Sequence, residues 1–140
     1  MRRTDIPRWS DELTVSEYLD AGGDPNAVLP NSSWTLLHLA AEFQDLELVQ
    51  RLVSTGADLN RPDEFGQTAL HFAVDIDIDG PTQQNEEEKI DFSTTKLLLA
   101  LGASPWVVDH RGRTARGWAE GYGPKLLKLF DECCGHLIND

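Results

Sequence analysis

A six-residue pattern occurs twice in this chain and constrains its fold more than any other feature. Residues 35–40 read TLLHLA, and residues 68–73, which follow 33 positions later, read TALHFA. A period of about this length is typical of proteins that stack copies of one small unit of secondary structure. Such a unit cannot bury its apolar face alone, so we expect it to be stable only against neighbouring copies.

The residues between the two copies predict a pair of short helices. Thr35 is a good N-cap, because its hydroxyl can accept a hydrogen bond from a backbone N–H of the first turn. The first helix would bury the leucines and alanines of residues 36–41. The second helix has an apolar face at helical spacing, formed by Leu46, Leu48, Val49, Leu52 and Val53. Gly56 then ends it, since the residue after a helix often has a positive φ.

These residues resemble the ankyrin repeat. Its signature Thr-Pro-Leu-His-x-Ala matches residues 35–40 and 68–73 except at the proline, which both copies lack. The second half of the family pattern, an apolar helix followed by Gly-Ala-Asp-x-Asn, matches residues 46–53 and 56–60. The resemblance implies that His38 and His71 are structural, because the family uses this ring to hydrogen-bond the backbone of a neighbouring loop.

The predicted fold is an all-α ankyrin-repeat solenoid in one domain, residues 1–140, with about four helix–turn–helix units. Their approximate bounds are 10–30, 31–62, 63–108 and 109–136. The first unit keeps only its second helix, and the last has Arg116 and Gly117 where the pattern has leucine and histidine. Both fit terminal caps that face water on one side.

The third unit is longer than the second. Thr68 and Thr114 are 46 positions apart instead of 33, which places an acidic insertion near residues 75–91. We expect this insertion to form a surface turn between the two helices of the unit, where added residues are tolerated.

The insertion also contains the pattern of a calcium loop. Asp75, Asp77 and Asp79 occupy positions one, three and five, a glycine follows, and Glu86 is at position twelve. Clustered oxygen ligands suit a hard cation such as Ca²⁺. Position eight is Thr82, where calcium loops normally have an apolar residue, so a solvated acidic segment without calcium is the alternative. No other cofactor is predicted.

Composition narrows the possible partners. The chain has 24 acidic and 12 basic residues, a formal charge of −12, which argues against binding to nucleic acid or anionic membranes and favours a basic protein. Simple solubility is the alternative explanation of this charge. The sequence has no signal peptide and no apolar stretch long enough to span a bilayer, and its two cysteines are adjacent, so a cytoplasmic location is expected.

No spacing of nucleophile and base predicts catalysis, so the candidate site is a binding surface. In ankyrin proteins partners contact the finger loops and the inner faces of the first helices, and the resemblance carries these positions to a set of residues here. They are Asn31, Ser32, Trp34, Glu42, Phe43, Glu64, Phe65, Gln67, Asp75, Ile76, His110, Arg111, Arg113 and Tyr122. The aromatic members would contribute most to binding. The alternative is that Trp34 and Phe43 pack between repeats.

The sequence therefore predicts a protein-binding module without catalysis that is a monomer on its own. A small acidic binder without a second domain fits an inhibitor or immunity-type protein that neutralises a basic toxin or nuclease. A calcium-regulated binding module and an assembly or scaffold subunit of an enzyme complex are the alternatives.

Overall fold

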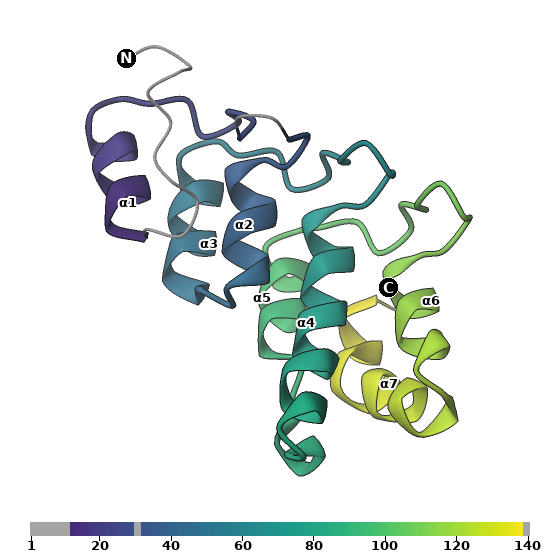
Figure 1. The fold of residues 1–140 in the computed structure, drawn as a ribbon. Coiled ribbons are helices and arrows are strands. Elements are labelled where there is room, and N and C mark those ends of the chain that lie inside the picture. The colour runs from purple at the N-terminus through teal and green to yellow at the C-terminus, as the bar shows by residue number, and fades with distance from the viewer. Residues whose placement is uncertain (1–11, 30–31, 139–140) are drawn as a thin grey trace.

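The computed structural model describes residues 12–29 and 32–138, whose arrangement is seen in Figure 1. Within these ranges the chain forms seven α-helices and one short 3₁₀ helix. Their bounds are α1 Glu12–Asp20, α2 Leu36–Glu42, α3 Leu46–Ser54, α4 Ala69–Gln83, η2 Glu87–Lys89, α5 Ser93–Ala100, α6 Ala115–Gly121 and α7 Pro124–Ile138. The extended backbone of the described residues pairs in an isolated bridge between Val28 and Thr35.

The helices stack in two rows (Figure 1). The inner row consists of α2, α4 and α6, in which α4 contacts both of the others. The outer row consists of α3, α5 and α7, and each of these packs on the inner-row helix that precedes it in the chain. At one end, Arg51 of α3 pairs with Asp20 of α1. The predicted all-α solenoid of stacked helix pairs is therefore confirmed.

Small and branched apolar side chains fill the space between the rows. In α2 the three leucines and two alanines of residues 36–41 are all buried, and the alanines allow neighbouring helices to approach closely. In α3, Leu48, Val49 and Leu52 are buried, and Val53 packs partly against them. Leu46 is 37% exposed, so the predicted apolar face of this helix is wrong at its first residue.

A threonine–histidine pair starts each of the first two inner helices and links it to the next unit. Nδ1 of His38 accepts a hydrogen bond from the Thr35 N–H at 3.0 Å, and its Nε2 donates to the Gln67 carbonyl at 2.8 Å. His71 makes the equivalent contact with the Arg113 carbonyl at 2.9 Å. The structural role that the resemblance implied for both rings agrees with these contacts.

Burial also favours the neutral form of these two histidines. Desolvation lowers the pKa of His38 and of His71 from the ordinary value of 6.5, and the hydrogen bond to a backbone carbonyl only partly opposes it. Because the folded-state pKa is below the unfolded-state pKa, the unfolded chain binds protons first as the pH falls. The free energy of unfolding should therefore be retained above about pH 6.5 and decrease as the pH falls toward the folded-state pKa.

Urea unfolding at about pH 7.5 and about pH 5.5 measures this decrease. In His71→Gln the free energy of unfolding should decrease less between these two pH values. In His110→Gln, at an exposed loop position, it should decrease as much as in the unsubstituted protein. If His71→Gln and His110→Gln depend on pH equally, His71 is not a source of the effect.

Asparagine side chains join successive loops at the ends of the outer helices. The side chain of Asn26 donates to the Gly56 carbonyl at 3.1 Å and accepts from the Asp58 N–H at 2.7 Å. Asn60 accepts from the Ser104 N–H at 2.8 Å. In the next loop the corresponding position is Trp106, which cannot make this bond.

The acidic insertion does not form the predicted surface turn. Instead α4 continues through it for 15 residues, whereas α2 has seven, and α4 extends beyond the end of α2 (Figure 1). Asp77 and Ile78 of the added turns are buried. The prediction is wrong for the first half of the insertion because Asp77 has a buried partner on α5, Thr95, which a count of acidic residues cannot reveal.

Candidate functional site

Two aspartates shape the finger loops that precede α4 and α6. One carboxylate oxygen of Asp63 accepts hydrogen bonds from the Phe65 and Gln67 N–H groups, both at 2.9 Å. Asp109 holds the next finger in the same way. The two fingers touch, because the His110 N–H donates to the Phe65 carbonyl at 2.9 Å. Phe65 is left 58% exposed at the tip.

Gly66 permits this close contact between fingers. Its φ is +80°, and a Cβ there would lie 2.7 Å from the His110 ring and 3.0 Å from the His110 backbone nitrogen. A side chain at this position would therefore be strained and would separate the fingers.

Asp109 also orders the side chains behind its finger. Its second oxygen accepts from Arg113 Nε at 3.1 Å and from the Trp118 indole at 3.0 Å. Burial alone would raise the pKa of Asp109, but the hydrogen bonds from Arg113, Trp118 and Arg111 lower it to about 2. The guanidinium carbon of Arg113 lies 4.7 Å from the centre of the Trp118 ring, so Arg113 is held within the chain.

The structure allows most of the predicted contact residues to be placed. The exposed ones are Ser32, Phe43, Glu64, Phe65, His110, Arg111 and Tyr122. The half-buried ones are Trp34, Glu42, Gln67, Asp75, Ile76 and Arg113. Asn31 lies outside the described residues. Trp34 packs edge-on against Phe72 of the next unit with ring centroids 4.6 Å apart, so the alternative of packing between repeats holds for Trp34, whereas Phe43 is 46% exposed.

Four of these residues meet in one pocket on the inner row, with a volume of about 200 Å³. Trp34, Glu42, Gln67 and Asp75 line it together with Phe72 and Trp118. Phe72 and Trp118 were not among the predicted contact residues. In the repeat signature they occupy the same position as Leu39 of the second unit, which is buried. The change from leucine to an aromatic residue at this position in the third and fourth units was the available signal.

The geometry agrees with the comparison to known proteins. Residues 37–76 match the family described as ankyrin repeats (many copies). This chain is an ankyrin-repeat protein.

Several relatives are similar to most of this ankyrin chain. The Neurogenic locus Notch protein of Drosophila melanogaster is 36% identical over 98 residues, which cover 65% of the chain and 4% of that protein. The Neurogenic locus notch homolog protein 1 of Xenopus tropicalis is 30% identical over 126 residues, 75% of the chain and 5% of that protein. The human Neurogenic locus notch homolog protein 4 is 44% identical over 89 residues, 59% of the chain and 4% of that protein. The chain thus spans only a small part of these relatives.

The four carboxylates of the predicted calcium loop do not converge in this ankyrin structure. Asp77 accepts from Gln44 and Thr95, Asp79 from Gln83, and Asp75 from Tyr122. Glu86 pairs with Lys89. The three aspartates lie on a helix, where residues two apart point roughly 200° away from each other. The part of the chain described contains no group of three or more His, Cys, Asp or Glu residues that could hold a metal ion, so the calcium-loop prediction is wrong.

Asp77 instead stabilises the start of α5. Its carboxylate accepts from the Thr95 N–H at 2.9 Å, the Thr95 hydroxyl at 2.8 Å and the Gln44 side-chain amide at 2.8 Å. Thr95 is in the first turn of α5, whose N-cap residue Phe92 provides no side-chain acceptor. Burial raises the pKa of Asp77, and these hydrogen bonds oppose the rise. Asp77 therefore caps one helix from another.

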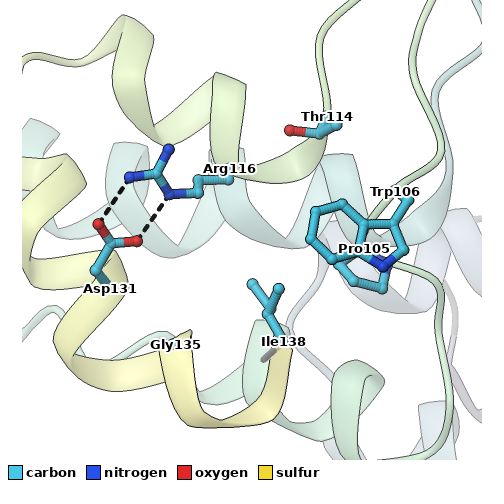
Figure 2. Close-up of a pocket in the computed structure, with 7 residues that line it drawn as sticks. All are labelled: Pro105, Trp106, Thr114, Arg116, Asp131, Gly135 and Ile138. Atoms are coloured by element: carbon cyan, nitrogen blue, oxygen red, sulfur yellow. Dashed lines mark hydrogen bonds and ion pairs between the residues drawn. The ribbon is translucent and has the colours of Figure 1, made fainter. Parts of the chain in front are cut away.

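A larger cavity of about 600 Å³ lies at the far end of the ankyrin stack, where α6 and α7 meet the loop after α5 (Figure 2). Arg116 and Asp131 lie at one side of it and form two hydrogen bonds of 2.9 Å. Trp106 borders it and is 66% exposed. None of the predicted contact residues lines this cavity, and its two charged side chains are paired with each other.

No helix among the described residues has the length and apolar character needed to cross a membrane.

Proposed function

We propose that this chain binds a basic protein through its inner face and does not act as a catalyst. The inner face consists of the finger loops at residues 63–67 and 109–113 and the accessible side chains of α2, α4 and α6. The observation that carries the proposal is the pocket in which Glu42 and Asp75 lie beside Trp34 and Trp118. Ankyrin repeats act as protein-interaction modules, and this surface combines aromatic area with unneutralised negative charge.

The basic character of the partner follows from charge. The formal charge of the chain is −12, and the inner face contains Glu42, Glu64 and Asp75. An acidic surface accelerates encounter with a basic protein and repels nucleic acid and anionic lipid. We propose an inhibitor or immunity-type role, in which the chain covers the active surface of a basic toxin or nuclease.

Alanine substitution of the exposed aromatic residue Phe65 should weaken the complex by about 2 kcal/mol, roughly 30-fold in Kd, because an aromatic side chain at the centre of an interface often contributes this much. Affinity capture from the host provides the partner, and calorimetry measures Kd. Since Phe65 is 58% exposed, circular dichroism should show an unchanged fold.

Gln50→Ala is the matched control, because Gln50 is exposed on α3 in the outer row. If Gln50→Ala weakens the complex and Phe65→Ala does not, the partner binds the outer helices and the proposal is wrong. The activity of the captured partner then separates the roles: an inhibitor abolishes activity at equimolar concentration, whereas an assembly or scaffold subunit leaves it intact.

A further inference from the structure

The inner-face pocket combines aromatic rings with carboxylates. Three successive units each contribute one aromatic ring to it: Trp34 before α2, Phe72 on α4 and Trp118 on α6. Glu42, the last residue of α2, and Asp75 of α4 add two carboxylates. No lysine or arginine of the described residues lines the pocket.

The two carboxylates differ in how they are satisfied. Asp75 accepts a hydrogen bond of 2.6 Å from the Tyr122 hydroxyl. Burial and the Asp75 carboxylate raise the pKa of Tyr122, which keeps this hydroxyl protonated as the donor. Glu42 is half-buried and has no hydrogen bond or ion pair with any described residue. Burial, followed by the nearby charges of Asp75 and Asp79, raises the pKa of Glu42. The pocket therefore holds two carboxyl groups, and no cation of the described chain pairs with either of them.

The aromatic rings suit the same kind of ligand. A guanidinium group is attracted to the face of a tryptophan ring when it lies within about 6 Å. Arg113 already occupies such a position, 4.7 Å from the Trp118 ring centre, but its charge is paired with Asp109. An aromatic ring at this place thus binds a guanidinium, while the carboxylates of the pocket still lack one.

We propose that the pocket binds one arginine side chain of the partner protein, with the guanidinium group between the carboxylates of Glu42 and Asp75 and beside the aromatic rings. This inference rests on the proposed function, since it identifies the partner residue that the inner face recognises. The volume of about 200 Å³ is below the roughly 300–1,000 Å³ of sites for drug-sized ligands, so a single side chain fits the pocket better than a metabolite. Arginine fits better than lysine because its planar fork can donate to two carboxylates and stack on a ring.

The experiment is an NMR titration of the isotope-labelled protein with N-acetyl-arginine amide. The neutral isostere N-acetyl-citrulline amide is the matched probe, because it keeps the shape and removes the charge. Arginine amide should shift the indole N–H signals of Trp34 and Trp118, and citrulline amide should not. Glu42→Gln should raise the Kd of arginine amide by about fivefold or more, since it removes the unpaired charge. Asp75→Asn should raise it in the same direction while keeping an acceptor for Tyr122.

Glu47→Gln, at an exposed position on α3, is the control and should leave the Kd unchanged. The spectrum of each variant reports directly whether it is folded. Equal shifts with citrulline amide, an unchanged Kd in Glu42→Gln, or no shift at the solubility limit would each overturn the proposal. A lysine amide that binds as tightly as arginine amide would overturn the assignment to arginine.

The failure of this inference can be distinguished from failure of the proposed function. If arginine amide does not bind but Phe65→Ala still weakens the complex with the captured partner, the inner face binds protein and the pocket assignment alone is wrong. If arginine amide binds at the pocket but the partner complex tolerates Phe65→Ala and requires Gln50, the pocket stands and the proposed function is wrong.

Discussion

Leu52→Ala should lower the free energy of unfolding by roughly 2–5 kcal/mol, the range for large-to-small substitutions in a packed core. Leu52 is fully buried in α3 between the two helix rows. The substitution removes apolar surface from contact and leaves a cavity that stacked helices cannot close completely. Leu37→Ala, in α2, should have an effect of the same size for the same reason. Urea unfolding followed by circular dichroism measures both.

Leu46→Ala provides a control within the same helix as Leu52. Leu46 is 37% exposed at the start of α3, so its loss should change the free energy of unfolding by less than about 1 kcal/mol. Equal losses for Leu46→Ala and Leu52→Ala would mean that the buried face of α3 has been assigned incorrectly.

Asp77→Ala should lower the free energy of unfolding by about 3 kcal/mol, because it leaves buried donors without an acceptor. The donors are the Thr95 N–H, the Thr95 hydroxyl and the Gln44 amide. The first turn of α5 depends on Asp77 for a cap, so α5 should open more readily than α2 in this variant. Hydrogen exchange should therefore become faster for the α5 amides than for the α2 amides.

Asp77→Asn separates hydrogen bonding from charge. The amide retains an oxygen for Thr95 and avoids the cost of burying a charge, so it should lose less than about half as much stability as Asp77→Ala. Asp79→Ala, two positions further along α4, should have little effect, because among the described residues Asp79 accepts a hydrogen bond from Gln83 of the same helix and from no other. A full loss in Asp79→Ala would contradict the assignment of the cap to Asp77.

The stacked fold was predictable because its signals are local and repeated. Thr35 and His38 recur as Thr68 and His71, and both pairs form the predicted helix starts and links between units. Leu48, Val49 and Leu52 have the helical period that burial of one face requires. Leu46 has the same period but lies at the helix end, where packing on neighbouring helices decides burial.

The candidate site was predictable in part. Trp34, Glu42, Gln67 and Asp75 were among the residues expected on the inner face, and they do meet in one pocket. Phe72 and Trp118 were not, because apolar residues at that repeat position are normally buried between units. Only the stacked structure brings Phe72 and Trp118 into one pocket with Glu42, which is far from both in sequence.

The acidic insertion shows most clearly what the sequence determines and what only the tertiary structure decides. The sequence by itself determined that residues 75–86 are rich in carboxylates and interrupt the repeat period. It could not determine that these residues extend α4, because its spacing of acids fits both a calcium loop and a helix. The tertiary structure decided for the helix. Burial of Ile78 and the hydrogen bonds that Thr95 and Gln44 donate to Asp77 stabilise that conformation through contacts distant in sequence.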